Sequence, residues 1–327
     1  MLLVQSASFP RSCVACLGSY RVSSGFFCSI FNRKGSTSSV EKHCSSSLKK
    51  QGSRRVAPAR SFNNTTAAEM NGSLLIERVP CLRDNYSWLL HDVSTGLTAV
   101  VDPAEETPVV AALQKNGWNL SHVLNTHHHW DHTGANLALK EKYQACVVGP
   151  KADQERIPGI DVALQDGDTY ALGKSQMMCY DTPGHTKGHI TLYFPDSKAL
   201  FPGDTLFSLG CGRLFEGTPA QMWHSLSKLM VLPEDVKVYC AHEYTLSNAK
   251  FATSIDPENK ALQQKTAEVE EARSKNIPTI PSILGVELQA NPFLRPFSSE
   301  IRTCLNIPQS ASNEEAFAAI RKAKDNF

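Results

Sequence analysis

Length, composition and charge exclude several classes of protein for this chain of 327 residues, of which 41% are hydrophobic and 20% charged. No apolar run approaches the ~18 to 20 residues of a membrane-spanning helix. Ten of the 33 basic residues but only one of the 32 acidic residues lie in residues 1–68, so the rest of the chain has a net charge of −8. Because an acidic protein is poorly suited to neutralising phosphates, we expect no nucleic-acid partner. We also expect no membrane partner and a monomer.

Residues 1–72 have the composition of a targeting segment. They are basic, rich in serine and almost free of acids, as in Ser36-Thr37-Ser38-Ser39. This composition predicts an organelle transit peptide, mitochondrial or alternatively plastid, and Pro10-Arg11 interrupts the apolar core that a secretory signal would need. A disordered tail is the other interpretation of the same composition.

From about residue 73, short β-rich runs alternate with fewer helical patterns. Strands are expected at 74–76, 86–90, 97–101, 120–124, 145–148, 177–180, 190–194, 199–201 and 236–240. Helices are expected from Thr107-Pro108 to Gly117 and at 135–142, 220–230, 259–276 and 313–325. Because strands outnumber helices and the helices fall at intervals, we predict two sheets covered by helices.

After residue 242 the sequence becomes more polar and helical, apart from an irregular proline-rich stretch at 278–296. We therefore predict two domains after the targeting segment. The first spans 73–242 and holds the sheets, and the second, over 243–327, is small and mainly helical.

The turn at 126–132 gathers four histidines and an aspartate directly after a predicted strand. His127 and His129, two positions apart, can aim their imidazoles at one ion, while Asp131 and His132 face another direction and can hold a second. Imidazole and carboxylate suit zinc, iron and manganese, and the absence of thiolates argues against a closed structural zinc site. The histidine between the first pair is expected to point away.

Two ions need more ligands than this turn supplies, and three candidates each follow a predicted strand: His185, Asp204 and His242. The carboxylate of Asp204 could bridge both ions. Alone, each of these residues would more often be a hydrogen-bonded structural residue. Four strand ends that converge on one edge favour a shared two-metal hydrolase site.

The complete pattern resembles the metallo-β-lactamase superfamily. The motifs that carry the resemblance are NTHHHWDH (125–132), TPGHT (182–186), GDTLF (203–207), GCGR (210–213) and HEYT (242–245). Together they resemble glyoxalase II, the hydroxyacylglutathione hydrolase family, over roughly residues 73–327. The resemblance implies an α/β fold, a four-layer αββα sandwich with a dimetal site at one edge and a small, mainly helical C-terminal domain that binds glutathione.

The resemblance also implies which ligand belongs to which ion. It gives His127, His129 and His185 to one metal, Asp131, His132 and His242 to the other, and Asp204 to both. The expected cofactors are two divalent ions per chain, zinc, iron or manganese, with a mixed zinc and iron pair among the options. A bridging hydroxide held by Asp204 and Asp131 would attack the thioester carbonyl.

The contacts with glutathione that the resemblance implies lie at Arg213, Phe215, Tyr244, Arg295 and Ser298. Three positions depart from the family pattern, which has Lys where Arg213 stands, Tyr where Phe215 stands and Lys where Ser298 stands. The missing hydroxyl and cation predict weaker glutathione affinity, unless a nearby basic residue such as Lys322 or Lys324 compensates.

The activity that the resemblance implies is hydrolysis of S-(2-hydroxyacyl)glutathione thioesters. A typical case is conversion of S-D-lactoylglutathione to glutathione and D-lactate, the second step of methylglyoxal detoxification. Two alternatives stay open, a mononuclear iron persulfide dioxygenase of the same fold and a non-catalytic metal or glutathione sensor. The dioxygenase family uses fewer protein ligands, so the presence of Asp131, His132 and His242 together counts against it.

Overall fold

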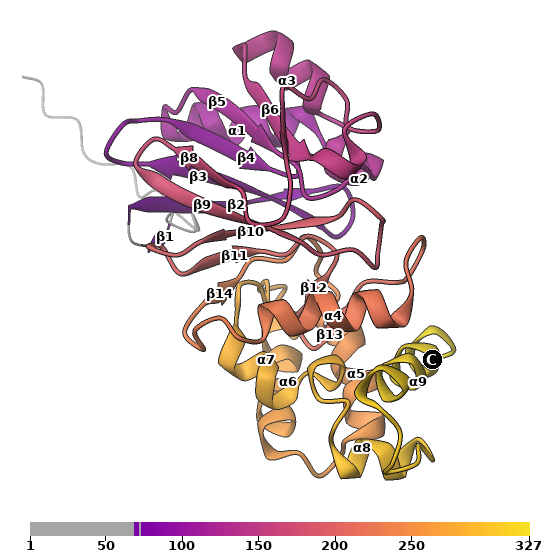
Figure 1. The fold of residues 1–327 in the computed structure, drawn as a ribbon. Coiled ribbons are helices and arrows are strands. Elements are labelled where there is room, and N and C mark those ends of the chain that lie inside the picture. Colours follow the sequence, from indigo (N-terminus) through magenta and orange to yellow (C-terminus); the bar gives the residue numbers. More distant parts are fainter. Residues whose placement is uncertain (1–68, 72) are drawn as a thin grey trace, which may run out of the picture. The chain divides into compact units, whose positions relative to one another are not determined.

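The structure is a computed structural model that describes residues 69–71 and 73–327. The predicted targeting segment, residues 1–72, lies outside the described residues apart from 69–71. The described residues form two large sheets, a two-stranded ribbon and helices on the outer faces of the sheets (Figure 1).

The first sheet follows the chain from one edge to the other. Its seven strands are β1 (Glu69–Asn71), β2 (Leu74–Cys81), β3 (Asn85–Asp92), β4 (Thr98–Val101), β5 (Leu120–Leu124), β6 (Cys146–Pro150) and β7 (Val162–Leu164), in that order. Strands β1 to β4 pair antiparallel, and β4 to β7 pair parallel. The carboxyl ends of β4, β5 and β6 therefore lie at one edge.

The second sheet has the order β15-β14-β11-β10-β9-β8. Its strands are β8 (Thr169–Leu172), β9 (Ser175–Asp181), β10 (Ile190–Phe194), β11 (Ala199–Phe201), β14 (Lys237–Val238) and β15 (Ser282–Ile283), and the ribbon is β12 (Leu206–Phe207) with β13 (Gly210–Cys211). Strand β14 lies parallel to β11, so the loops that follow both strands leave the sheet on the same side.

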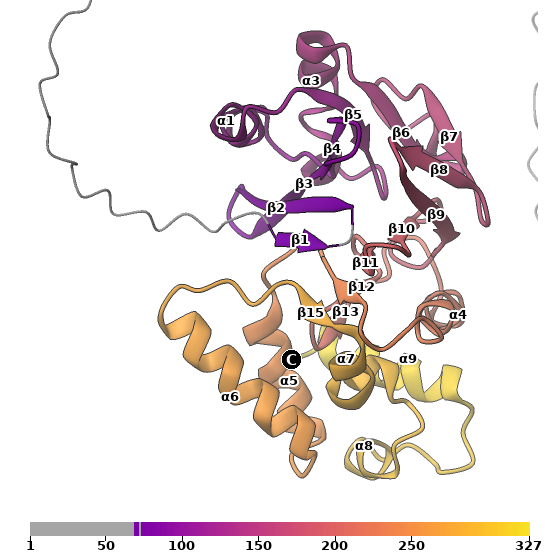
Figure 2. The same ribbon diagram turned by 90° about the vertical axis from the view of Figure 1, so that its left-hand side faces the viewer.

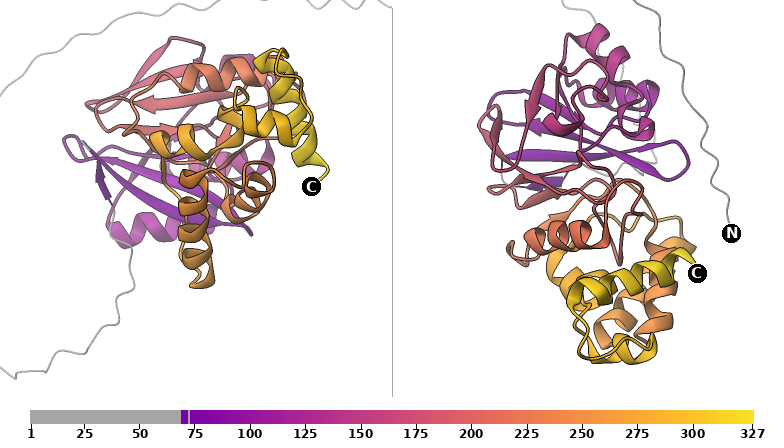
Figure 3. Two further views of the ribbon diagram at one scale, coloured as in Figure 1. Left: turned by 90° about the horizontal axis from the view of Figure 1, so that it is seen from below. Right: turned by 45° about the vertical axis from the view of Figure 1, so that its right-hand side comes forward.

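Helices cover both sheets. They are α1 (Glu106–Asn116), α2 (Trp130–Thr133), α3 (Asn136–Tyr143), η1 (Lys151–Asp153), α4 (Pro219–Leu229), α5 (Thr245–Ile255), α6 (Lys260–Ser274), α7 (Leu284–Ala290), η2 (Pro292–Leu294), α8 (Ser299–Cys304) and α9 (Asn313–Asp325). Figure 2 shows α1 and α3 on the first sheet and α4 beside the second, and Figure 3 shows α9 near α4 among the C-terminal helices. Within the described residues, none of the helices has the length and apolar character needed to cross a lipid bilayer.

Alternating buried side chains hold these layers together. In β3, Leu90 packs between the two sheets, and its neighbour Leu89 packs on the opposite face, in the cluster that contains Leu113 of α1. In β11, Phe201 joins the cluster between the sheets while Leu200 packs with α4 and α9. Because successive side chains of a strand face opposite sides, strands apolar at every position are buried on both faces. The predicted four-layer αββα arrangement is confirmed.

Two local predictions were wrong. Residues 278–296, predicted as irregular, contain β15, α7 and η2, because Pro281 and Pro292 precede or begin elements, where a missing N–H costs little. Helix α1 starts after Glu105 rather than at Thr107, although it ends as predicted at Gly117, whose φ of 68° suits glycine.

Candidate metal centre

All seven predicted ligands meet at the edge where strands of both sheets end. The turn after β5 carries four of them, the β9–β10 loop carries His185, the segment after β11 carries Asp204, and the segment between β14 and α5 carries His242. Three groups have possible ligand atoms within 4.8 Å of one another, and one of them, Asp102, His127 and His132, includes one residue of each of the others. The other two groups are His127, His129 and His185, and Asp131, His132 and His242. We call them the three-histidine half-site and the aspartate half-site.

In the three-histidine half-site, three ring nitrogens face one point. The Nδ1 atom of His129 lies 3.1 Å from Nε2 of His127 and 3.0 Å from Nε2 of His185. The Nδ1–H of His185 donates to the backbone carbonyl of Arg213 at 2.8 Å. A neutral imidazole with Nδ1 protonated keeps its Nε2 lone pair free, so His185 presents a lone pair to the half-site.

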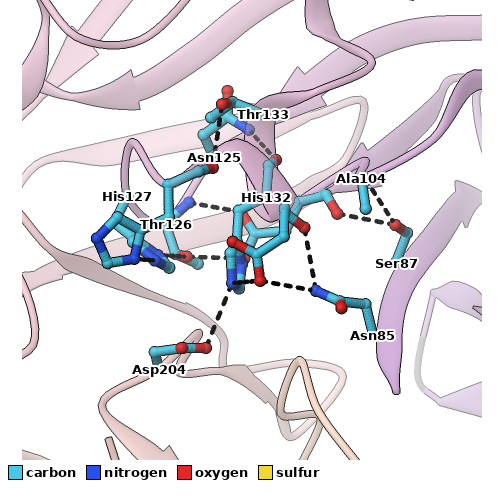
Figure 4. A network of polar contacts seen from close by, with 12 residues as sticks. Asn85, Ser87, Ala104, Asn125, Thr126, His127, His132, Thr133 and Asp204 are labelled. Carbon is cyan, nitrogen blue, oxygen red and sulfur yellow. Dashed lines mark hydrogen bonds and ion pairs between the residues drawn. The ribbon is translucent and has the colours of Figure 1, made fainter. Parts of the chain in front are cut away.

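Thr126 fixes His127 in the same way. Its hydroxyl donates to Oδ2 of Asp102 at 2.7 Å, so its oxygen accepts from Nδ1 of His127 at 3.0 Å. Figure 4 shows Thr126 and His127 side by side above Asp204. The Nε2 lone pair of His127 is thereby also directed into the half-site.

In the aspartate half-site, two carboxylates set the tautomers. The Nδ1–H of His132 donates to Asp102 at 3.0 Å, and that of His242 donates to Asp84 at 3.2 Å. The two Nε2 atoms then face each other at 3.3 Å. Two lone pairs at that distance repel, so this arrangement requires a positive charge between them, a proton or a metal ion.

Asp204 lies between the half-sites with one oxygen toward each. Its Oδ2 is 3.3 Å from Nε2 of His185, while its Oδ1 is 3.5 Å from Nε2 of His132 and 3.4 Å from Nε2 of His242. Among the residues that the structure describes, Oδ1 is one of few buried side-chain oxygens that accept no hydrogen bond. A buried carboxylate oxygen without a donor fits a metal ligand, and two oxygens facing two clusters fit a bridge.

The two half-sites differ in electrostatics. Burial, followed by neighbouring histidines, holds the pKa of His127 well below its usual value and lowers that of His129 to about 4. Burial also opposes protonation of His242, but Asp204 outweighs it and raises the pKa to about 10. Burial would raise the pKa of Asp204, yet the charges of His242 and His132 keep it well below its usual value.

Several residues around the ligands were missed from the sequence. Asp102 accepts from both Thr126 and His132, and Nε2 of His189 accepts from the backbone N–H of Asp204 at 3.1 Å. The sequence did contain a feature that could have indicated Asp102, because Asp102 follows a predicted strand just as Asp204 does. His128 points away as predicted and pairs with Asp153 at 2.8 Å.

A cavity of about 610 Å³ opens on this centre. It is lined by His185, Asp204, Phe207, Cys211, Arg213, Phe215, Tyr244, Ser247, Asn248, Arg321, Lys324, Asp325 and Phe327. The Phe215 ring lies edge-on to His185 at 5.1 Å, and the Tyr244 ring stacks on His242 at 4.7 Å. Three of the predicted substrate contacts, Arg213, Phe215 and Tyr244, therefore lie where the cavity meets the predicted ligands.

The other two predicted contacts do not line this cavity. Arg295 forms an ion pair with the buried carboxylate of Asp256, and Ser298 caps α8 by accepting from the N–H of Ile301. Arg321 and Lys324 of α9 line the cavity instead. They are three positions apart, so they share one face of the helix.

The cations of this cavity are close enough to affect one another. Burial, followed by the charges of Arg321 and Arg213, lowers the pKa of Lys324. Its ammonium donates to the carbonyl and hydroxyl of Ser247, both neutral. The guanidinium of Arg321 is buried, forms an ion pair with Asp325 and donates to the carbonyl of Cys211. The cavity therefore offers positive charge to an anionic ligand, with Lys324 less neutralised than Arg321.

Comparison with known proteins identifies related families for both regions of the described chain. The family described as "Metallo-beta-lactamase superfamily" matches residues 82–242, and the one described as "Hydroxyacylglutathione hydrolase C-terminus" matches residues 243–327. A hydroxyacylglutathione hydrolase of Methylococcus capsulatus is 54% identical over 254 residues, 78% of this chain and 99% of the relative. One of Rhizobium meliloti is 50% identical over 247 residues, 76% and 96% of the two chains.

Solved structures resemble this chain in fold. ETHE1 from Myxococcus xanthus superimposes with a TM-score of 0.55 at 24% identity, covering 76% of this chain and 89% of that chain. The BLEG-1 B3 metallo-beta-lactamase superimposes with a TM-score of 0.52 at 20% identity, covering 67% and 99%. At these identities the likeness concerns the sandwich and not the reaction.

Proposed function

The chain belongs to the hydroxyacylglutathione hydrolase family of the metallo-beta-lactamase superfamily, and on that basis we propose that it hydrolyses S-(2-hydroxyacyl)glutathione thioesters. The proposed typical substrate is S-D-lactoylglutathione, which yields glutathione and D-lactate. One observation carries the proposal: a single cavity joins the metal-ligand residues His185 and Asp204 to the cations of Arg213, Arg321 and Lys324.

We propose two divalent ions, one in each half-site, with Asp204 as the shared ligand. Zinc, iron and manganese all suit a donor set of imidazoles and carboxylates, and a mixed zinc and iron pair is included. When bound, such ions supply a water that ionises near neutral pH and a positive field for the thioester carbonyl. The unpartnered Oδ1 of Asp204 and the facing Nε2 atoms of His132 and His242 support this occupancy.

The protein's own residues bind and orient the substrate. Arg213 and Lys324 would hold the carboxylates of glutathione, which fixes the thioester beside Asp204 and lowers the entropic part of the barrier. Burial raises the pKa of Tyr244, so its hydroxyl stays protonated and can donate to the substrate. The glutathione thiolate, with a free pKa near ~8.5, leaves without a general acid.

The two alternative activities are not favoured. Relatives at about half identity over nearly their whole length are named hydroxyacylglutathione hydrolases. A dioxygenase with a single iron would not use the aspartate half-site as a second metal site. A sensor would not need the nucleophilic water that hydrolysis requires. Oxygen uptake with glutathione persulfide, measured at an oxygen electrode, would support the dioxygenase instead.

The proposal is tested by comparing two thioesters with the same acyl group. S-D-lactoylglutathione carries the glutathione carboxylates, and the lactoyl thioester of N-acetylcysteamine does not. Loss of thioester absorbance should give a kcat/KM about a hundredfold higher for the glutathione thioester, because remote binding energy lowers the barrier. Equal values for the two substrates, or no hydrolysis of either, would contradict the proposal.

We also propose that the protein is imported into mitochondria, from the basic, serine-rich composition of residues 1–68, and that it acts as a monomer. Plastid import is the alternative. Fluorescent fusions of residues 1–72 would discriminate the two compartments, and light scattering of the purified protein would give its molar mass.

A further inference from the structure

We infer that the turn between β2 and β3, residues 82–84, together with Asn85 at the start of β3, is part of the metal centre, because Asp84 and Asn85 position the ligands His242 and Asp131. They act as positioning residues that control how tightly the aspartate half-site holds its ion. The inference rests on the proposed dinuclear centre and adds to it a segment far from the ligands in sequence.

Asn85 holds Asp131 by two hydrogen bonds. Its Nδ2 donates to Oδ2 of the Asp131 side chain and to the Asp131 backbone carbonyl, both at 3.1 Å. The same Oδ2 lies 3.6 Å from Nε2 of His132 and 3.6 Å from Nε2 of His242. The oxygen that faces the half-site is therefore the one that Asn85 fixes, and Figure 4 shows the Asn85 side chain pointing toward His132.

Asp84 holds His242 by the ring nitrogen that faces away from the half-site. Its Oδ1 accepts from Nδ1 of His242 at 3.2 Å, which leaves the Nε2 lone pair directed into the half-site. The Tyr244 ring lies parallel to the His242 ring, with an interplanar angle of 4°. The carboxylate and the stacked ring together define the orientation of this imidazole.

Backbone hydrogen bonds tie the turn to the segment that carries His242. The N–H of Tyr86 donates to the carbonyl of Ala241 at 2.6 Å, and that of Glu243 donates to the carbonyl of Asp84 at 2.9 Å. Asn85 and His242 also form an isolated antiparallel bridge. The Tyr86 hydroxyl adds a bond to Glu243 at 2.8 Å. The turn and the ligand segment are therefore joined by both backbone and side-chain hydrogen bonds.

The three-histidine half-site has a different support. His127 is held through Thr126, and His185 through the backbone carbonyl of Arg213. Neither Asp84 nor Asn85 contacts these groups in the described hydrogen bonds. A change in the turn should therefore weaken one half-site and spare the other.

The test is zinc binding to the full-length protein, measured by competition with a chromophoric chelator. The wild type should bind two equivalents. In Asn85→Ala, one equivalent should keep its wild-type affinity and the other should weaken about 10- to 100-fold, the usual effect of removing a hydrogen bond to a metal ligand. Asn85→Asp, which sets a carboxylate against Asp131, should have the same selective effect, and Asp84→Asn, which keeps an acceptor for His242, should weaken that equivalent less than Asp84→Ala.

Asn116→Ala is the matched control, because its amide also donates to a carboxylate, that of Glu77, away from the centre. Both zinc affinities should stay at the wild-type value in this variant. Wild-type affinities in Asn85→Ala, or an equal loss at both equivalents, would overturn the inference while leaving thioester hydrolysis by the wild type intact. Fewer than two equivalents in an inactive wild type would overturn the proposed function and the inference together.

Discussion

The two half-sites lie at the same edge of the sandwich and share Asp204, yet their surroundings differ in charge. A hydroxyl and a backbone carbonyl support the three-histidine half-site, where burial lowers the pKa of His127, His129 and His185. Two carboxylates, Asp102 and Asp84, support the histidines of the aspartate half-site, whose pKa values are raised. A fold can thus give two adjacent half-sites unequal electrostatic environments through residues that lie outside both half-sites.

Replacing the shared ligand should have the largest effect. In Asp204→Ala both half-sites lose an anionic ligand at once, so we expect zinc content to fall toward zero and kcat/KM to fall by about a thousandfold or more. Elemental analysis and the thioester assay measure both. A variant that keeps two tightly bound ions would show that Asp204 does not bridge.

The difference in charge should set the order in which ions leave. Because the aspartate half-site has the extra carboxylate of Asp131, its ion should be the second to be removed by a chelator. Asp131→Asn removes that charge and should weaken the tighter equivalent about 10- to 100-fold, so that the two equivalents leave together. If Asp131→Asn weakens the looser equivalent instead, the assignment of the half-sites is wrong.

The cavity next to the half-sites should affect substrate binding without affecting metal binding. Lys324→Ala removes a cation from the cavity, and we expect KM for S-D-lactoylglutathione to rise about tenfold with unchanged zinc content. Lys322→Ala is the matched control, because Lys322 is exposed and does not line the cavity. Equal KM values for the two variants would exclude Lys324 from substrate binding.

The smallest expected effect is on stability and concerns Glu216. Its hydrogen bonds connect two loops beside the three-histidine half-site. Its carboxylate accepts from Arg156 and from the N–H of Lys187, and the hydrogen bond from Arg156 lowers its pKa to about 2. Since the folded pKa of Glu216 lies below its usual value of 4.5, the stabilisation by its carboxylate is complete above that pH and is lost as the pH falls toward 2.

Glu216→Gln should therefore lower the free energy of unfolding at pH 5 to 7 by about 1 kcal/mol or less, because the ion pair of Glu216 with Arg156 is partly exposed. The melting temperature should fall slightly as a result. The difference from the wild type should shrink toward pH 2 when calorimetric melts are compared. A difference that does not change with pH would mean that the charge of Glu216 contributes nothing.

The sequence brought the seven candidate ligands together because four of them lie in one short turn and His185, Asp204 and His242 each follow a strand. Their assignment to two ions came from the resemblance to the family and stays a prediction. The layers were predicted because strands outnumber helices and the helices fall at intervals. In the structure, strands such as β3 and β11 are buried on both faces, which explains why cover is needed on both sides.

The supporting residues could not be predicted, because their roles depend on contacts between distant segments. Asp84 meets His242 across 158 positions, and Asn85 meets Asp131 across 46. The direction of the Arg295 side chain could not be predicted from a cation near a proline-rich turn, and in the structure it pairs with Asp256. Its contact with glutathione stays a prediction. Lys324 lies on a helix whose start and length were predicted, but which of its faces meets the cavity depends on packing against α4.

The most direct test of the central claim is reconstitution of the metal-free protein. Zinc is added in fractions of an equivalent to the chelator-treated chain, and hydrolysis of S-D-lactoylglutathione is followed after each addition. Two half-sites that share Asp204 predict activity that reaches its plateau at two equivalents per chain. Full activity at one equivalent, or activity that persists without metal, would contradict the dinuclear account.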